Sequence, residues 1–209
     1  MKKLLSLLLL PILTIVLTAC GANTNSSDSN ASVNTESHNV SESTTADANS
    51  SNHILVAYFS ATGNTQAVAE RLANGLHANL FNIVPAEPYT SEDLDYNNDA
   101  SRTSLEMNDP ASRPAIAELL NSIEQYDTIF LGYPIWWGDA PRIMSTFMES
   151  YDFSGKTIIP FCTSGSSGIN QSVATLQALA EDADWRDGQR FDADVDQTTL
   201  LEWVDSLNL

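Results

Sequence analysis

The sequence predicts an α/β protein with a parallel sheet that is covered by helices on both faces. Largely apolar runs at 54–60, 128–133 and 156–162 alternate with segments of helical periodicity. Strands that are apolar throughout are typical of parallel sheets buried on both sides. Each of the three runs also ends in a loop of unusual composition, and ligands of such sheets bind beyond the carboxyl ends of the strands.

The first half of the folded region is expected to contain two strands and two helices. A strand over 54–60 is followed by a helix over 65–76, in which apolar residues recur every three to four positions. A second strand is expected over 80–84. A long polar stretch, 85–114, comes next, and within it 93–107 is a candidate helix. A connection of that length is usually functional or partly helical.

The second half repeats the alternation of strands and helices. A short helix is expected after Arg113, because Pro114 suits the first turn of a helix. The final strand is weaker than the others, since Asp187 and Gly188 interrupt it. The complete set comprises helices at 114–123, 141–151, 173–180 and 200–207, and strands at 128–133, 156–162 and 185–191.

The turn between the first strand and the first helix predicts an anion site. A helix start leaves its first amides unpaired, and these amides attract phosphate together with the helix dipole. Hydroxyl and amide side chains add further donors, whereas the loop contains no Lys or Arg. The same turn also suits plain helix capping, and it has neither the ending of a triphosphatase loop nor the glycines of a dinucleotide fingerprint. The loop consists of Ser60, Ala61, Thr62, Gly63, Asn64 and Thr65.

Two further loops are expected at the same edge of the sheet. One offers indole faces, and the other has glycines that let the backbone approach a flat ring closely. A phosphate cradle at one end and a planar slot at the other predict a mononucleotide-like ligand. The first of these loops contains Pro134, Ile135, Trp136, Trp137 and Gly138, and the second contains Thr163, Ser164, Gly165, Ser166, Ser167 and Gly168.

The three loops resemble the cofactor loops of flavodoxins. Segment 60–65 resembles the phosphate loop of that family, and segments 133–138 and 163–168 resemble the two loops that sandwich the isoalloxazine ring. The resemblance extends from Ile54 to the end of the chain. It implies a three-layer flavodoxin-like fold, a five-stranded parallel sheet of order 2-1-3-4-5, and FMN as the cofactor. The stretch 85–114 is not a feature of the shortest flavodoxins and is expected to cap the flavin or to form a substrate wall.

The resemblance also implies a role for each loop. The phosphate is expected to bind to 60–65, and Trp136 or Trp137 is expected to stack on the flavin. Pro134 and Ile135 are expected to present backbone groups to the ring. The opposite wall and the polar edge of the ring are expected to involve Ser164, Gly165 and Gly168.

The N-terminus predicts export and a lipid anchor at the outer face of the cell membrane. Lys2 and Lys3 precede an apolar run over 4–17, which is short for a membrane-spanning helix and typical of a secretory signal. The tetrapeptide that ends in Cys20 resembles a bacterial lipobox; the alternative is an ordinary signal peptide with an incidental cysteine. The expected division is a signal peptide at 1–19, a lipidated cysteine with a disordered tether at 20–52, and a folded domain at 53–209.

The charge of the chain argues against nucleic acid as a partner. Nine basic and 27 acidic residues give a formal charge of −18, and such a surface repels nucleic acid and attracts basic partners. The leading hypothesis is electron transfer by bound FMN to a redox partner protein or a small acceptor. A low potential is expected for the last electron, because acidic surroundings disfavour a reduced anionic flavin. The alternatives are an NAD(P)H-dependent FMN reductase of quinone-like acceptors and a non-redox module that binds a phosphorylated ligand.

Other reactive side chains are interpreted as structural. The histidines fall away from the strand ends, and Ser166 and Ser167 have no evident base, so a hydrolytic triad is not expected. The histidines and cysteines do not show the spacing of metal ligands. Cys162 lies inside an apolar strand and is interpreted as a packing residue rather than a redox thiol. Arg142 is interpreted as a surface arginine without a specific contact, and a contact with the phosphate of a nicotinamide cofactor is the alternative.

Overall fold

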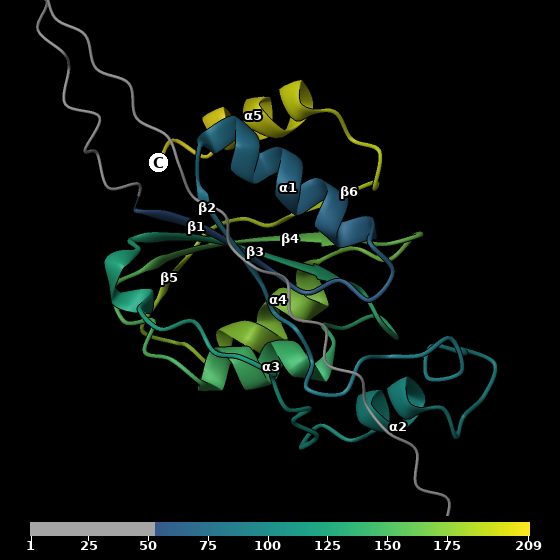
Figure 1. The fold of residues 1–209 in the computed structure, drawn as a ribbon. Coiled ribbons are helices and arrows are strands. Elements are labelled where there is room, and N and C mark those ends of the chain that lie inside the picture. Colours follow the sequence, from purple (N-terminus) through teal and green to yellow (C-terminus); the bar gives the residue numbers. More distant parts are fainter. Residues whose placement is uncertain (1–52) are drawn as a thin grey trace, which may run out of the picture. The chain divides into compact units, whose positions relative to one another are not determined.

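The computed structural model describes residues 53–209, so the predicted signal peptide and the tether with Cys20 lie outside the described part. None of the helices within residues 53–209 combines the length and the apolar character that a membrane crossing requires. The elements, labelled in Figure 1, are β1 (Ile54–Tyr58), α1 (Asn64–Leu76), β2 (Asn79–Asn82), α2 (Arg102–Asn108), the 3-10 turn η1 (Ile123–Gln125), β3 (Thr128–Pro134), α3 (Arg142–Glu149), β4 (Thr157–Thr163), α4 (Asn170–Gln177), β5 (Asp184–Trp185), β6 (Gln189–Phe191) and α5 (Gln197–Ser206).

The sheet is parallel and has the order β2-β1-β3-β4-β5, which confirms the predicted fold class and strand order. The fifth position is divided between β5 and β6, which both pair with β4. Ile158 is the last residue of β4 opposite β5, and Phe161 is the first opposite β6. Pro160 lies between these two stretches and has no amide hydrogen to donate, so the ladder is interrupted there.

Helices cover both faces of the sheet, as Figure 1 shows, with α1 and α5 on one face and α3 and α4 on the other. Neighbouring strand residues point to opposite faces: Val56 and Tyr58 pack with α1 and α5, whereas Leu55 and Ala57 pack in the other cluster. Both faces are therefore buried, which is why the central strands carry apolar side chains on both sides. The large side chains that are fully buried include Phe59, Phe130, Tyr133, Phe147 and Phe161.

The expected helix over 114–123 is wrong. This segment pairs instead with the start of the insertion: the Ala86 amide donates to the Ala115 carbonyl and the Ala117 amide to the Val84 carbonyl, both at 2.8 Å. Only η1 follows before β3. Long-range pairing satisfies the backbone groups that a local helix would have used. This pairing outweighs the tendency of Pro114 to start a helix.

The candidate helix over 93–107 is correct only in its second half, where α2 begins after Ser101. The Ser101 hydroxyl caps this helix by accepting from the Ser104 amide at 3.3 Å. Residues 90–100 form turns, because Asp93 and Asp95 accept from nearby amides and so compete with helical hydrogen bonding. The remaining expected elements are present, with ends shifted by at most three residues and with the weak final strand split in two.

Substitution of Gly132 by alanine is expected to destabilise the sheet by about 2–3 kcal/mol. Gly132 lies on β3, and a β-carbon there would collide with the ring of Phe161, which is fully buried and has no space to retreat. Urea unfolding of Gly132→Ala measures the loss. Gly168→Ala is the matched control, because a β-carbon at that position meets no atom within 4 Å; equal losses for the two variants would contradict the packing argument.

Candidate functional site

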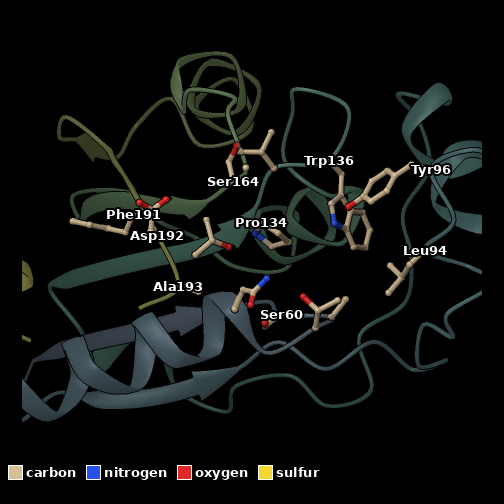
Figure 2. A pocket seen from close by; sticks show the side chains of 15 residues that line it. Ser60, Leu94, Tyr96, Pro134, Trp136, Ser164, Phe191, Asp192 and Ala193 are labelled. Carbon is tan, nitrogen blue, oxygen red and sulfur yellow. The ribbon is translucent and has the colours of Figure 1, made fainter. Parts of the chain in front are cut away.

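A cavity of about 480 Å³ lies beyond the carboxyl ends of the strands (Figure 2). Its volume is within the range of small-molecule and cofactor pockets. Its walls come from the loops that follow β1, β3, β4 and β6 and from the long insertion between β2 and β3. The lining residues are Ser60, Ala61, Thr62, Asn64, Leu94, Tyr96, Pro134, Ile135, Trp136, Thr163, Ser164, Gly165, Phe191, Asp192 and Ala193.

The loop after β1 opens directly into the start of α1. Gly63 precedes the helix with φ +88°, a conformation that favours glycine. Its amide donates to the Ser60 hydroxyl oxygen at 3.1 Å, which closes the turn and leaves the Ser60 proton available for a ligand. No side chain caps the start of α1. The first amides of this 13-residue helix are therefore free of side-chain acceptors and suited to an anion.

Thr163 joins the three predicted loops. Its hydroxyl shares a buried hydrogen bond of 2.8 Å with the Thr65 hydroxyl at the start of α1. Its carbonyl accepts from the Ile135 amide at 3.0 Å, which fixes the loop after β3. The last residue of β4 thus holds the phosphate-type loop and the tryptophan loop at a defined separation.

The tryptophan loop is a tight hairpin. Trp136 and Asp139 exchange two backbone hydrogen bonds of 2.9 Å. The two residues between them, Trp137 and Gly138, have φ values of +48° and +80°, as a type I′ turn requires. Trp136 is only 3% exposed, and Trp137 is 42% exposed. The two neighbouring tryptophans therefore lie in different surroundings, because side chains alternate in direction at the end of a strand.

All residues of the three loops except Ser167 are predicted to bind the cofactor, and the structure brings ten of these sixteen residues into the cavity wall. Thr65 is buried behind the wall, where it supports Thr163. Gly63 shapes the turn, and Trp137 lies outside the lining. The other predicted residues that the lining does not include are Gly138, Ser166 and Gly168.

Sequence reasoning missed five lining residues. Phe191 is the last residue of β6, and Asp192 and Ala193 follow it. The predicted strand at 185–191 placed this segment at the correct edge, so topology alone was a usable signal. Leu94 and Tyr96 belong to the insertion. The stretch 85–114 was expected to cap the flavin or to form a substrate wall, but its polar composition did not indicate which of its residues line the cavity.

Arginines hold two of the cavity walls through hydrogen bonds to backbone carbonyls. Arg190 donates to the Ser164 carbonyl at 2.5 Å and pairs with Asp192 at 3.1 Å. Arg71 of α1 donates to the Ala193 carbonyl at 2.7 Å. Both guanidinium groups therefore fix backbone that lines the cavity. The site itself offers hydroxyls, amides and the carboxylate of Asp192.

An aromatic and ionic cluster holds the insertion together internally. The Arg102 guanidinium lies 4.0 Å from the centre of the Tyr89 ring and pairs with Glu106 at 2.7 Å. The Tyr89 hydroxyl donates to the same carboxylate at 2.7 Å. Burial and, to a smaller extent, this carboxylate raise the pKa of Tyr89, so that it remains a neutral donor.

Arg142 is not a surface arginine, and the interpretation from the sequence is wrong. It is 8% exposed. Its guanidinium pairs with Asp139 at 3.3 Å and donates to the Met107 carbonyl at 3.0 Å, and Asp139 also accepts from Thr175 at 3.1 Å. The residue thus links α3 to the tryptophan turn and to the end of α2. Its burial places it behind the site and not in the cavity wall.

Cys162 is fully buried in the sheet, and burial raises the pKa of its thiol to about 12. A thiol that is inaccessible and protonated at neutral pH is a poor nucleophile and a poor redox centre. The prediction that Cys162 is a packing residue is therefore confirmed.

Comparisons with known proteins identify one family and several solved structures that are similar to this chain. The flavodoxin family profile matches residues 53–207. A protein of Bacteroides eggerthii DSM 20697, provisionally described as a flavoprotein, is 47% identical with a TM-score of 0.71, over 75% of this chain and 98% of that one. A protein of Bacteroides uniformis ATCC 8492 with the same description is 45% identical with a TM-score of 0.71, over 74% and 98%. A flavoprotein of Lactobacillus acidophilus NCFM in complex with FMN shares the fold at 20% identity, with a TM-score of 0.55 over 72% and 97%. A comparison with curated proteins gives no match.

Replacement of Arg142 by methionine is expected to lower the free energy of unfolding by about 3 kcal/mol, because it leaves Asp139 mostly buried without its cation. Arg113→Met is the matched control, because it too removes one ion pair of an arginine, in this case the pair with Glu149 of α3. That pair is partly exposed and is expected to contribute less than about 1 kcal/mol. Thermal and urea unfolding compare the two variants. A loss at Arg142 no larger than that at Arg113 would show that the buried link does not hold the turn.

Proposed function

Because this chain belongs to the flavodoxin family, we propose that it binds FMN in the described cavity and transfers electrons. The observation that carries the proposal is the convergence of the three loops on one cavity, with the uncapped start of α1 at its edge. The FMN in the Lactobacillus acidophilus complex supports the choice of cofactor. Bound FMN supplies the redox chemistry, and the residues of the chain bind and orient it.

The phosphate is held by hydrogen bonds and by the helix dipole in this proposal. Ser60 and Thr62 offer hydroxyls, Asn64 offers its side-chain amide, and the first backbone amides of α1 point to the same place. Neutral donors at a helix start stabilise a dianion without a basic residue. The donor set therefore fits a phosphate monoester such as that of FMN.

The ring lies between the tryptophan turn and the loop after β4 in the proposed complex. Pro134 and Ile135 line the floor of the cavity, and Ser164 and Gly165 line the side formed by the β4 loop. A β-carbon at Gly165 would meet no atom within 4 Å, so the backbone there is open to a flat ligand. The Ile135 amide is already engaged by Thr163, so the floor keeps its shape with or without a ligand.

The engagement of the basic side chains favours an electron carrier over a nicotinamide-dependent reductase. A nicotinamide dinucleotide brings two or three further phosphate groups, which proteins commonly bind with arginine. Within residues 53–209, every Lys and Arg side chain already contacts an acceptor of the protein. These residues are Arg71, Arg102, Arg113, Arg142, Lys156, Arg186 and Arg190. The proposed electron partner is thus a redox protein or a small acceptor. The acidic surface favours a redox protein with a positively charged surface.

FMN is expected to bind more tightly than riboflavin, and Thr62→Ala is expected to weaken FMN binding about tenfold while leaving riboflavin binding unchanged. The variant removes one hydroxyl donor to a charged phosphate, worth about 1.5 kcal/mol. Fluorescence titration of the flavin measures both affinities. Thr198→Ala, at the start of α5 and outside the cavity, is the matched control. Equal affinity for the two flavins would contradict the phosphate site, and a protein that takes up neither would favour the non-redox ligand module.

The proposed location is the outer face of the cell membrane, through lipid on Cys20. Two or more acyl chains provide stable anchoring where a single chain does not. Cys20→Ser is therefore expected to release the protein from the membrane fraction or to stop its maturation, whereas Cys162→Ser is expected to leave membrane association unchanged because Cys162 is buried in the sheet. Fractionation of cells that express the full chain tests this. A Cys20→Ser protein that matures and still sediments with membranes would remove the lipid anchor from the proposal.

A further inference from the structure

Three aromatic side chains line the cavity, but only one has a free surface. Trp136 and Phe191 are 3% and 6% exposed, whereas Tyr96 is 62% exposed. Figure 2 shows Tyr96 and Trp136 on one side of the cavity and Phe191 with Asp192 on the opposite side. A ring that is to stack on a flat ligand must have an accessible face. Tyr96 alone among these three has most of its surface available.

The other two rings are occupied by contacts within the protein. Trp136 packs edge to face against Phe59 and Tyr89, with ring centres 5.4 and 5.2 Å apart. Phe191 packs in the same way against Trp203, at 5.1 Å. These contacts belong to the hydrophobic core on each face of the sheet. Trp136 and Phe191 therefore close the cavity as core residues, and their faces are not open to a ligand.

Tyr96 is supported from behind by the exposed tryptophan of the hairpin. The ring centres of Tyr96 and Trp137 are 5.0 Å apart, with an angle of 48° between the planes. Trp137 does not line the cavity. It occupies a left-handed position, φ +48°, that is unfavourable for a large side chain. The hairpin and the insertion thus meet at an aromatic pair whose inner member, Tyr96, faces the cavity.

Hydrogen bonds fix the turn that carries Tyr96. The Asp95 carboxylate accepts from the Asn97 amide at 2.9 Å, and the Asp95 carbonyl accepts from the Asn98 amide at 3.2 Å. On the other side, the Asp93 carbonyl accepts from the Thr103 amide of α2 at 3.1 Å. The position of Tyr96 is therefore set before a ligand arrives, which lowers the entropic cost of stacking.

We propose that Tyr96 is a ring-stacking residue of the flavin site, contributed by the insertion. This inference rests on the proposed binding of FMN. It assigns to Tyr96 the role that the family resemblance gave to Trp136 or Trp137. Trp136 then forms the inner end of the cavity, and Trp137 supports Tyr96 from outside. The insertion caps the isoalloxazine ring in this arrangement.

Tyr96→Ala and Tyr96→Phe test the proposal, with Leu105→Ala as the matched control. Leu105 lies on α2 of the same insertion, is 57% exposed and does not line the cavity. Loss of one stacking ring is expected to weaken binding about tenfold, or about 1.4 kcal/mol. FMN and riboflavin are expected to lose affinity alike, because they share the ring, and the fluorescence of bound flavin is expected to rise because a quenching neighbour is lost. Tyr96→Phe keeps the ring and is expected to bind like the unaltered protein, and so is Leu105→Ala.

Two results would overturn the inference and can be told apart. If the unaltered full-chain protein binds no FMN, the proposed function fails together with this inference. If that protein binds FMN, and Tyr96→Ala retains both the affinity and the quenched fluorescence, the FMN site stands and Tyr96 has no contact with the ring. Far-UV circular dichroism and the unfolding temperature, both expected to be unchanged for an exposed turn residue, show that each variant is folded.

Discussion

The site depends on the hydrogen bonds of one residue at the end of the central sheet. Thr163 binds the Thr65 hydroxyl through its side chain and the Ile135 amide through its carbonyl. Its backbone is paired with Pro134 of β3 in the register of the sheet. A phosphate loop and a ring-binding loop are thus attached to the same rigid strand end. A site that is built on strands in this way keeps its geometry more accurately than one built on free loops.

The sequence predicted the features that follow from local pattern and topology. The side chains of Val56, Phe130 and Ile159 pack on one face of the sheet, and those of their neighbours pack on the other. Continuous apolar runs therefore predicted a parallel sheet that is buried on both faces. The carboxyl ends of such strands meet at one edge, which predicted that the three loops lie close together, and they surround one cavity. Ten predicted residues line the cavity because topology fixes strand ends more firmly than it fixes individual side chains.

Two features that the sequence did not predict depend on contacts between distant segments. The segment after Pro114 pairs with Val84 and Ala86 instead of forming a helix. Arg142 looks like a surface residue in sequence, but Asp139 and the Met107 carbonyl hold it in the interior. Both cases show tertiary contacts that override local propensity. They concern the insertion, whose polar composition did not indicate that it packs against α3.

The distribution of charge connects the structure to the proposed electron transfer. The arginines next to the cavity, Arg71 and Arg190, are held by carbonyl groups of its walls, and Asp192 contributes a carboxylate to the lining. Because Arg190 pairs with Asp192 at 3.1 Å, the lining carries no unbalanced carboxylate, and the negative field comes from the excess of acidic over basic residues in the chain, 27 against 9. Such surroundings disfavour an added negative charge on a reduced ring far more than they disfavour a phosphate held at the helix start. In the proposed complex, the helix start binds the dianionic end of FMN, and the acidic surroundings are expected to keep the potential of the last electron low, because the two ends of the cofactor lie in different electrostatic surroundings.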